Sequence, residues 1–437
     1  MSLKQSVEAT ATIESLTHEG RGVAHIDGKA VFIDGALPGE EVRFRYRAKH
    51  RTYDEGDTVD VINASPDRVA PRCAHFEMCG GCSMQHVSAA AQIQSKQQVL
   101  LDNLQRIGHV EPEHIAPPLT AAPWGYRRRA RLGAKFVDKK NAMLVGFHEK
   151  RSHFLAAIER CEVLHPAFGE RIVALRDLLR SLDAYKRIPQ LEVACGDDAA
   201  AMVVRHLEAL TPADRERFVQ FGRAHDIEIF LQSGGPDTIH LLWPEQSRLS
   251  YRLPEFDVEL VFRPTDFVQV NSAINRQMVS QALDWLALQG HERVLDLYCG
   301  LGNFTLPLAR RARLAIGVEG ERKLVQAGEA NAARNHITNA QFFVGDLAHP
   351  CDDLPWTRGQ HYDAVLLDPP RVGAEPVLSV VGRSGASRVV YVSCNPATLA
   401  RDAGILVRDH GFKLKRAGAM DMFPHTTHTE AMALFER

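Results

Sequence analysis

The sequence lacks any long apolar run: nothing in it approaches the roughly 18 apolar residues of a membrane-spanning helix. Its first residues, MSLKQSVEATATIE, lack the apolar core of a secretory signal. These absences predict a cytosolic chain with no membrane partner. A strong net charge is also missing, since the formal charge is −2, so any affinity for nucleic acid has to come from local basic patches. Apolar residues make up 45% and charged residues 24% of the 437 positions, which excludes a disordered chain and leaves room for about three domains.

Cysteine is scarce, with eight residues in the chain, yet three of them fall within the stretch PRCAHFEMCGGCSMQH. In a cytosolic chain such a cluster points to a metal or to catalysis rather than to disulfides. Cys73, Cys79 and Cys82 supply three thiolates, and Cys161, which ends a strand-like apolar run ahead of Pro166, supplies a fourth. Zinc ribbons normally pair two C-x2-C knuckles, and the stretch has one, so the spacing favours a [4Fe–4S] cluster. Zinc or a purely structural group of thiols is the alternative.

The first 70 residues predict a small β-barrel, because short β-rich runs alternate there with glycine-containing turns. In RFRYRAKHR every second residue is basic, so one face of the strand becomes a basic stripe. Like charges on one face would repel each other, which favours a polyphosphate partner over a solvated edge strand. The stripe consists of Arg43, Arg45, Arg47, Lys49 and Arg51. The segment resembles a TRAM domain, an OB-like RNA-binding barrel.

A second basic cluster lies in GYRRRARLGAKF, which contains no acidic residue. Tyr126 and Phe136 flank it, and arginines next to aromatic rings suit both phosphate contact and base stacking. A solvated run of charges is the alternative. The predicted RNA contacts in this cluster are Arg127, Arg128, Arg129 and Arg131. Between the cysteines and this cluster, AAAQIQSKQQVLLDNLQRIGHV predicts a helix whose apolar face is Ile93, Val99, Leu100, Leu101 and Leu104.

The C-terminal third predicts a nucleotide-binding α/β sheet. ERVLDLYCGLGNFTLPLARRA reads as a strand, a tight turn at Gly300 and Gly302, and a helix. A second strand ends in Glu319, whose carboxylate suits the hydroxyl groups of a ribose. The third glycine of the dinucleotide fingerprint is missing, which favours S-adenosylmethionine (SAM) over NAD. Asp346 and Asp368 end the next two strands, and the strand-like runs that close the chain predict a terminal antiparallel hairpin.

A further cysteine, Cys394, ends a buried-looking strand in RVVYVSCNPATLARD. Open α/β sheets bind their ligands at the carboxyl ends of their strands. A lone buried cysteine is more often inert than reactive, but the position of Cys394 favours a nucleophile. Cys299 is the competing thiol, interpreted as packing because it belongs to the glycine turn. Cys195 and Cys351 have no such context.

Along nearly all of its length the chain resembles the RNA uracil-C5 methyltransferase family. The matching motifs are CAHFEMCGGC, YRRRARL, DFVQVN, LDLYCGLGNF, LLDPPRVG, VSCNPATLARD and DMFPHTTHTE. The barrel together with four cysteines resembles the branch that methylates a uridine of 23S ribosomal RNA. The resemblance implies a multidomain α/β fold. It has a TRAM barrel over 1–70, a central α/β domain with an iron–sulfur cluster over 71–90 and 124–265, and a Rossmann-like SAM methyltransferase domain over 91–123 and 266–437 that ends in the antiparallel hairpin.

The resemblance also assigns roles to residues. Cys394 is the expected nucleophile toward uracil carbon 6, and Glu430 of HTTHTE is the expected base. Phe267 is expected to face a flipped uridine in a single-stranded or loop region of the RNA. Cys73, Cys79, Cys82 and Cys161 are expected to hold the cluster. The expected SAM contacts are Gln269, Tyr298, Gly300, Gly302, Asn303, Glu319, Asp346 and Asp368.

A monomer that methylates carbon 5 of a 23S uridine is therefore the leading hypothesis. The nearest alternative is the same chemistry on another ribosomal or transfer RNA uridine. A NAD-type iron–sulfur oxidoreductase is disfavoured by the missing glycine and the terminal hairpin. A non-catalytic RNA-binding module would leave Cys394 and Glu430 without a role.

Overall fold

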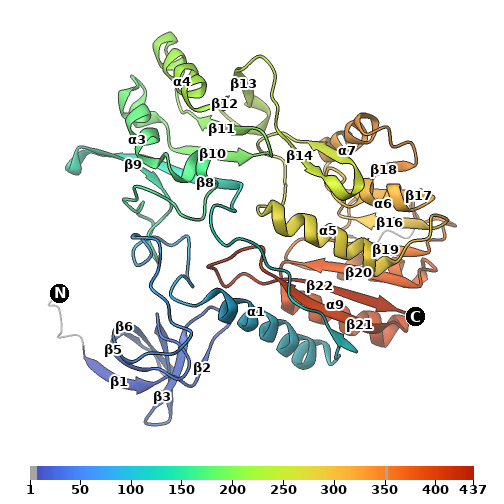
Figure 1. Cartoon of the computed structure of the whole chain (residues 1–437), viewed down its shortest axis with the longest axis horizontal. Coiled ribbons are helices and arrows are strands. Elements are labelled where there is room, and N and C mark those ends of the chain that lie inside the picture. Colours follow the sequence, from blue (N-terminus) through green and yellow to red (C-terminus); the bar gives the residue numbers. More distant parts are fainter. Residues whose placement is uncertain (1–6, 350–352) are drawn as a thin grey trace.

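The computed structural model describes residues 7–349 and 353–437, so Cys351 lies outside the described residues. Within them the strands form two six-stranded sheets, a two-stranded ribbon and an eight-stranded sheet. Figure 1 shows the first sheet as a separate body at the lower left, with the central sheet above it and the C-terminal sheet at the right. No helix in these described ranges is long and apolar enough to cross a membrane.

The N-terminal sheet has the strand order β1-β5-β6-β4-β3-β2. Along β5 the side chains alternate as the sequence predicts, since Val42 and Phe44 are buried while Arg43 and Arg45 are exposed. Its strands are β1 (Glu8–Thr12), β2 (Ser15–Leu16), β3 (Gly22–Ile26), β4 (Lys29–Asp34), β5 (Glu41–Lys49) and β6 (Tyr53–Asn63).

The second sheet forms the middle of the chain, with the order β13-β12-β11-β10-β8-β9. Its strands are β8 (Arg129–Val137), β9 (Ala142–Gly146), β10 (Gln190–Cys195), β11 (Ala200–Arg205), β12 (Ile227–Gln232) and β13 (His240–Trp243), and its helices are α2 (Pro166–Gly169), α3 (Ile172–Ser181) and α4 (Pro212–His225). A ribbon of β14 (Ser250–Leu253) and β15 (Val258–Val261) leads from it toward the C-terminal sheet.

The C-terminal sheet has the order β18-β17-β16-β19-β20-β22-β21-β7. The five strands from β18 to β20 are parallel, and β22 lies antiparallel between β20 and β21, which is the terminal hairpin that the sequence predicts. The strands are β7 (His114–Ile115), β16 (Arg293–Leu297), β17 (Leu314–Glu319), β18 (Ala340–Val344), β19 (Ala364–Leu367), β20 (Arg388–Ser393), β21 (Lys413–Met420) and β22 (Glu430–Glu436).

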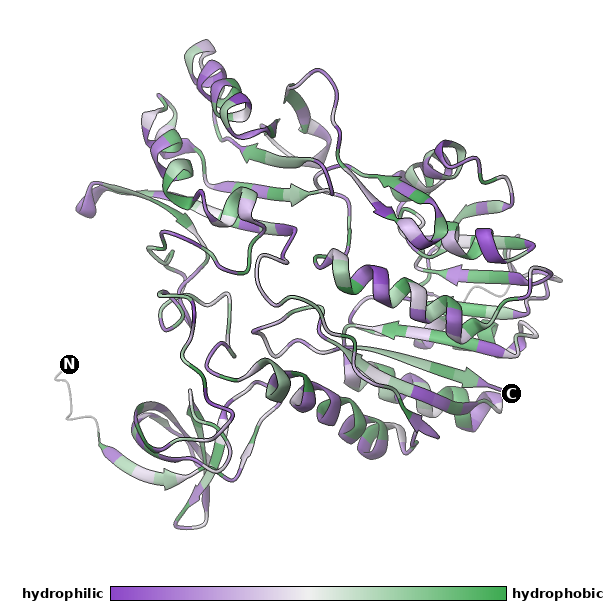
Figure 2. Cartoon of the chain, viewed as in Figure 1, coloured by the Kyte–Doolittle hydropathy of each residue, from purple (hydrophilic) through white to green (hydrophobic). Residues whose placement is uncertain are grey.

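Helices cover both faces of this sheet, which explains why its strands are nearly continuous apolar runs. Along β19, Ala364 and Leu366 pack into the core under α5, α6 and α7, while Val365 and Leu367 pack into the core under α1, α8 and α9. The strands of this sheet are accordingly largely green in Figure 2. The helices are α5 (Ser272–Leu286), α6 (Thr305–Arg311), α7 (Arg322–Arg334), α8 (Glu375–Arg383) and α9 (Pro396–His410).

The predicted helix after the cysteines is α1 (Ala89–Asn103), which continues as a short π-helical turn, η1 (Leu104–Gly108). Ser88 caps it by accepting a hydrogen bond from the Ala91 amide. Its buried face differs from the predicted one, because Gln92 and Lys96 are buried with Ile93 and Leu100, whereas Val99 and Leu101 are only half-buried. The apolar pattern misses these two polar residues because their partners lie on a distant segment. The remaining short turns of helix are η2 (Asp138–Lys140), η3 (Tyr185–Arg187), η4 (Pro236–Thr238) and η5 (Pro254–Phe256).

Candidate active site

The glycine turn after β16 is built from residues in the left-handed region. Tyr298, Gly300 and Gly302 have φ angles of 66°, 55° and 97°, and α6 begins directly after the turn. A Cβ at Gly302 would lie 3.2 Å from the Leu306 side chain, so the turn is both strained for other residues and tightly packed. The sequence prediction of a strand, a tight turn and a helix is therefore correct here.

Glu319, on the neighbouring strand, binds the backbone of this glycine turn. It is the last residue of β17, and β16 and β17 are parallel, so their carboxyl ends meet at one edge of the sheet. Its Oε2 accepts a hydrogen bond from the Gly300 amide at 3.1 Å, and its Oε1 accepts one from the Glu321 amide at 3.0 Å. The half-buried carboxylate keeps lone pairs that could accept hydrogen bonds from a diol.

Asn303 is fixed by two residues that the sequence did not single out. Its amide exchanges two hydrogen bonds with Asn275 of α5, at 3.0 and 2.9 Å. The Tyr251 hydroxyl of β14 donates a further bond to Asn303 Oδ1 at 2.9 Å, and burial raises the pKa of Tyr251, so it remains a neutral donor. No motif contains Tyr251 or Asn275, because each comes from a different element and only the fold brings them to the turn.

Asp346 and Tyr298 meet at the loop that follows β18. Asp346 is exposed, and hydrogen bonds from the Ala348 amide (3.0 Å) and from His349 (2.8 Å) lower its pKa. The Tyr298 hydroxyl donates to the Leu347 carbonyl at 3.3 Å. Both expected SAM contacts therefore border the same strand end.

Gln269 and Asp368 approach each other from distant parts of the chain. Asp368 directly follows β19, and Gln269 Nε2 lies 3.5 Å from its Oδ2. Desolvation raises the pKa of Asp368 to about 7. Gln269 precedes α5, where the Asn271 side chain caps the helix by accepting from the Ile274 amide. Phe267, two residues before Gln269, is 63% exposed and remains available to a ligand.

Cys394 occupies the single residue between the end of β20 and the cap of α9. Asn395 caps this helix by accepting a hydrogen bond from the Ala397 amide, and Pro396 begins it. The thiol is half-buried at the carboxyl edge of the sheet. Desolvation raises its pKa to about 11, with Glu430 and Asp368 adding to the rise and Arg371 opposing it.

Glu430 is the first residue of β22, the antiparallel neighbour of β20. Ser393 pairs with Ala431, so Cys394 and Glu430 are the next residues on the two strands. Glu430 is 6% exposed, and burial, followed by the charge of Asp368, raises its pKa to about 8. The structure thus brings together a thiol and a carboxyl group whose proton affinities are both shifted upward.

The four clustered cysteines line one cavity of about 230 Å³. Cys73, Cys79 and Cys82 come from the segment between the barrel and α1, and Cys161 comes from the loop before α2. All four are free thiols, and the Gly81 amide lies 3.4 Å from Cys79 Sγ as a hydrogen-bond donor. Burial raises the pKa of Cys82 to about 12 and that of Cys161 to about 11.

Four convergent, desolvated thiols are a donor set that suits a cationic centre, which would offset the cost of ionising them. Within residues 7–349 and 353–437, no group of three or more His, Cys, Asp or Glu side chains is arranged to hold a single metal ion. The cysteines surround a cavity rather than a point.

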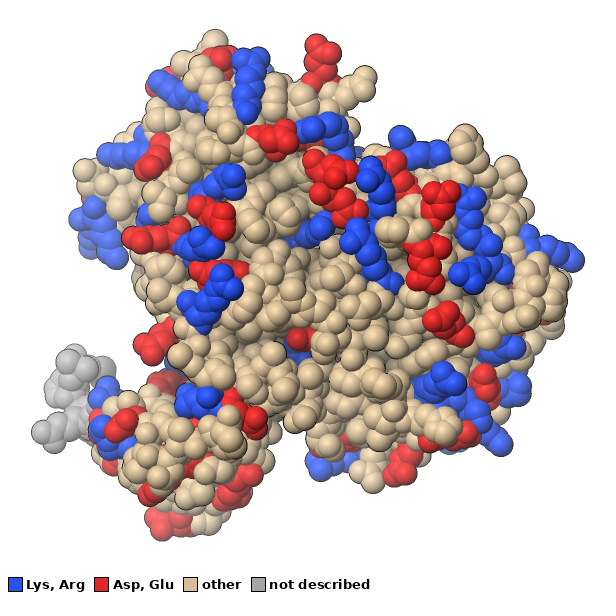
Figure 3. Space-filling model, viewed as in Figure 1, with Lys and Arg blue, Asp and Glu red and all other residues tan. Residues whose placement is uncertain are grey.

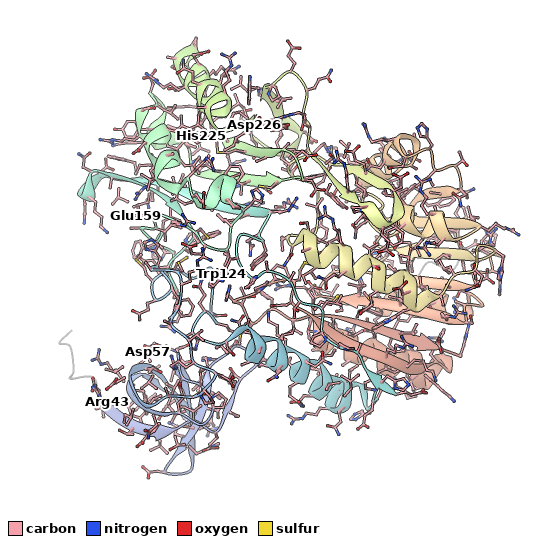
Figure 4. The ribbon with its side chains drawn as sticks, in the orientation of Figure 1. Arg43, Asp57, Trp124, Glu159, His225 and Asp226 are labelled. Carbon is pink, nitrogen blue, oxygen red and sulfur yellow. The ribbon has the colours of Figure 1, made fainter. Side chains whose placement is uncertain are left out.

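The basic stripe of the barrel corrects one premise of the sequence analysis. Arg43 and Arg45 both pair with Glu8 at 2.8 Å, and Arg47 pairs with Asp34 at 2.7 Å and with Asp57 at 2.6 Å. Strands β1, β4 and β6 supply these acids, so the arginines do not face uncompensated repulsion. Figure 3 shows Lys and Arg mixed with Asp and Glu over the barrel, and Figure 4 labels Arg43 and Asp57 on it. Repulsion therefore gives no reason to infer a polyphosphate partner for this stripe.

The second basic cluster is also partly structural. Arg128 pairs with Asp197 at 2.8 Å, and Arg129 pairs with Glu192 at 3.0 Å while donating to backbone carbonyls near position 265. Arg131 is 66% exposed and reaches Glu192 only at 3.4 Å. Arg127 lines the cysteine cavity. Of the four arginines, Arg131 is the one most available to RNA.

Comparisons with known proteins agree with this arrangement. A family model described as tRNA (Uracil-5-)-methyltransferase matches residues 241–346 and 357–437, and a TRAM domain model matches residues 7–45. A protein of Hahella chejuensis is 52% identical over 435 residues, covering 98% of this chain and 97% of the relative. One of Nitrosococcus oceani is 52% identical over 430 residues, covering 98% and 96%. Both are named 23S rRNA (uracil(1939)-C(5))-methyltransferase RlmD.

Among solved structures, the tRNA (uracil-54, C5)-methyltransferase of Pyrococcus abyssi in complex with S-adenosyl-L-homocysteine matches with a TM-score of 0.74. The match covers 98% of this chain and 99% of that one at 22% identity. At this identity the likeness shows the fold, and it extends over the whole chain rather than over the C-terminal sheet alone.

Proposed function

The chain belongs to the RNA uracil-C5 methyltransferase family, and from this premise we propose that it transfers a methyl group from SAM to carbon 5 of a uridine in 23S ribosomal RNA. The observation that carries the proposal is the placement of Cys394 beside Glu430 at the sheet edge that also holds the glycine turn. The relatives at 52% identity are named for 23S RNA. This favours 23S RNA over a transfer RNA, although the 22% identical structural neighbour acts on a transfer RNA.

Uracil carbon 5 is a poor nucleophile, and Cys394 is the group that activates it. The thiol loses its proton to solvent, the thiolate sulfur forms a bond to carbon 6, and the electrons of the carbon 5–carbon 6 double bond move into an enolate that is nucleophilic at carbon 5. SAM supplies the methyl group that carbon 5 accepts, and the sulfur that loses it keeps the bonding electrons in S-adenosyl-L-homocysteine. The positive charge of Arg371 favours the thiolate and so opposes the effect of burial on the pKa of Cys394.

Glu430 is proposed to complete the reaction as the general base. Its carboxylate removes the proton from carbon 5, the carbon–hydrogen electrons restore the double bond, and the carbon 6–sulfur bond breaks to release Cys394. Attack on carbon 6 needs the base to leave its stack, so we infer that the uridine is flipped from a single-stranded or loop region. We propose that Phe267, which is 63% exposed and close in sequence to Gln269, contacts the flipped base or a neighbour.

SAM is proposed to bind along the carboxyl edge of the C-terminal sheet. Glu319 would accept hydrogen bonds from the ribose, and the tight turn at Gly300 and Gly302 would let the backbone approach the ligand. Asn303, held by Asn275 and Tyr251, presents a fixed amide beside this turn. Gln269, Tyr298, Asp346 and Asp368 border the same edge and complete the proposed contacts.

We further propose that Cys73, Cys79, Cys82 and Cys161 hold a [4Fe–4S] cluster with a structural and RNA-positioning role. The support is the shared cavity, the desolvated thiols and the Gly81 amide directed at Cys79. Such a centre would link the segment after the barrel to the loop before α2, although these two segments are far apart in the sequence. We expect a cytosolic monomer that meets no membrane.

One experiment tests the central proposal. Purified protein is incubated with 23S RNA lacking modifications and with SAM labelled in its methyl group, and the labelled nucleotide is mapped. Label at carbon 5 of one 23S uridine supports the proposal. Label confined to transfer RNA when both substrates compete would instead assign the same chemistry to a different RNA.

A further inference from the structure

The segment 421–425, which leads to Glu430, is held by two buried polar side chains of α1. Lys96 is 2% exposed, and its Nζ donates hydrogen bonds to Asp421 Oδ1 at 2.7 Å and to the Phe423 carbonyl at 2.9 Å. Gln92, one helical turn earlier and 1% exposed, accepts a bond from the His425 amide at 2.8 Å. Burying an ammonium group and an amide is costly unless their hydrogen bonds are satisfied. Lys96 therefore holds this segment, and Gln92 joins it to the end of the cysteine segment, because Gln92 Nε2 also donates to the Met84 and Val87 carbonyls at 3.0 and 2.8 Å.

Other parts of the chain hold the same segment. The Ser83 and Met84 amides, next to Cys82, donate to the His425 carbonyl at 2.9 and 3.0 Å. Trp124 stacks on the His425 ring with centroids 3.9 Å apart, and Figure 4 shows it at the middle of the molecule. The Tyr126 hydroxyl donates to the Pro424 carbonyl at 3.0 Å. The segment thus receives support from α1, from the cysteine segment and from the start of the central domain at once.

This anchorage lies next to the proposed base. Met420 of β21 pairs with Glu430 of β22, and Asp421, the partner of Lys96, is the residue that follows Met420. The Lys96 ammonium is therefore bound to the residue that follows the partner of Glu430 in the hairpin. Movement of Asp421 would be transmitted directly to the first pair of the hairpin.

Most of the titratable groups around Glu430 disfavour its carboxylate form, and two cations favour it. Asp368 at the end of β19 is acidic and raises the pKa of Glu430, Cys394 after β20 is a thiol beside it, and Asp421 after β21 is acidic and pairs with Lys96. Arg371, in the loop after β19, and Lys96, on α1, are the cations that favour the Glu430 carboxylate. Arg371 has the larger effect on the pKa of Glu430, and Lys96, at 2% exposure, is the cation that is enclosed in the protein.

We propose that Lys96 and Gln92 are positioning residues for Glu430: both fix the segment 421–425 against α1, and Lys96 adds the positive charge that favours the carboxylate form of Glu430. The inference rests on the proposed function, in which that carboxylate accepts the carbon-5 proton after methyl transfer. Loss of either residue should slow the release of methylated RNA from Cys394 more than it slows methyl transfer.

The test separates the two steps in a single turnover with methyl-labelled SAM and unmodified 23S RNA. Label in RNA reports methyl transfer, and a band of covalent protein–RNA adduct on a denaturing gel reports the delay before elimination. Removing Lys96 alone would leave Asp421 buried and unpaired, so the informative comparison is Asp421→Asn against the double variant Lys96→Met with Asp421→Asn. Both variants lack that unpaired charge, and only the double variant lacks the cation.

In the double variant we expect the adduct to accumulate at neutral pH and the midpoint of the elimination profile to rise above that of the wild type. Asp421→Asn alone should show a smaller upward shift than the double variant, because burial lowers the pKa of Lys96 and Glu430 remains as its acidic partner when Asp421 is neutral. Gln92→Leu should accumulate adduct without moving the midpoint, since it loosens the segment but changes no charge. Gln94→Leu, an exposed glutamine on the same helix, is the matched control and should behave as wild type.

The inference is overturned if the double variant keeps the wild-type midpoint and forms no adduct. If Lys96 has only a structural role, methyl transfer and elimination should slow equally, and to the same extent in the double variant and in Asp421→Asn. That result would also overturn the inference. The outcome for Glu430→Gln separates this failure from a failure of the proposed function. If Glu430→Gln accumulates adduct while the Lys96 and Gln92 variants do not, the function stands and the positioning role is wrong. If wild type forms no 5-methyluridine, the function itself is wrong.

Discussion

Cys394 and Glu430 face each other one residue beyond the Ser393–Ala431 pair, where β20 and β22 run antiparallel. The strand register therefore places a candidate nucleophile and a candidate base side by side, although 36 positions separate them in the sequence. Their pKa values, about 11 and about 8, are both raised by burial in the same edge of the sheet. A pKa of about 8 suits a general base, whereas the Cys394 thiol has to lose its proton before its sulfur can attack, a loss that Arg371 favours.

Replacement of Glu430 by Gln should stall the reaction after methyl transfer. The amide cannot accept the carbon-5 proton, so a covalent adduct between Cys394 and methylated RNA should accumulate. A denaturing gel with labelled RNA, followed by peptide mapping of the shifted band, measures it. Turnover at the wild-type rate without adduct would remove Glu430 from the role of base and transfer it to Asp368 or a bound water.

Cys394→Ala should form neither adduct nor product, because the enolate cannot arise without the thiol, while SAM binding should be retained. Methylated RNA is measured by label incorporation and SAM binding by calorimetry. The double variant Cys394→Ala with Glu430→Gln is the control. An adduct that survives in it would identify another thiol, with Cys299 beside the glycine turn as the first candidate.

Elimination should depend on pH through Glu430. The base acts when it is ionised and its pKa is about 8, so the elimination rate should rise about tenfold per pH unit below 8 and level off above it. A pre-formed adduct, transferred by rapid mixing into buffers of different pH, allows this step to be timed alone. A profile that is flat between pH 6 and 9 would contradict the assignment.

Cys161→Ser should lose iron, because three thiolates leave one corner of a cluster without its ligand. Anaerobically purified wild type should be brown with about four irons per chain, and the variant should contain clearly less and unfold at a lower temperature. Iron analysis and thermal unfolding measure the two effects. Cys195→Ser, at a buried cysteine outside the cavity, is the control for iron content. Stoichiometric zinc in the wild type would overturn the cluster proposal.

Arg131 and Arg128 should respond differently to neutralisation. Arg131→Gln removes an exposed charge, so RNA affinity should fall and the slope of log affinity against log salt should flatten by about one contact, with stability unchanged. Arg128→Gln breaks a mostly buried pair with Asp197 and should cost about 1–3 kcal/mol of stability. Filter binding over a salt series and chemical denaturation distinguish them. If both variants flatten the salt dependence equally, Arg128 also belongs to the RNA-binding surface.

Much of this protein is determined by local sequence. The glycine turn at Gly300 and Gly302 is predictable because few other residues adopt its φ angles, and the parallel strands are predictable because burial on both faces demands continuous apolar runs. Asn395 and Pro396 mark the start of α9 and so place Cys394 at a strand end. Family membership and the uracil-C5 methyltransferase reaction, inferred from the motifs, are confirmed by relatives at 52% identity.

The buried polar contacts of α1 and the ion pairs of the barrel were decided by the tertiary structure alone. Both depend on contacts between segments that are distant in the sequence. Lys96 and Gln92 occupy polar positions in a helix pattern and are buried only because Asp421 and His425, more than 300 residues away, satisfy their hydrogen bonds. The sequence alone indicates no ion-pair partners for the basic stripe of the barrel. Neighbouring strands nevertheless bring Glu8 and other acids against it. Strand register and long-range ion pairing carry no local signal, since the partners are chosen by the packing of the whole chain.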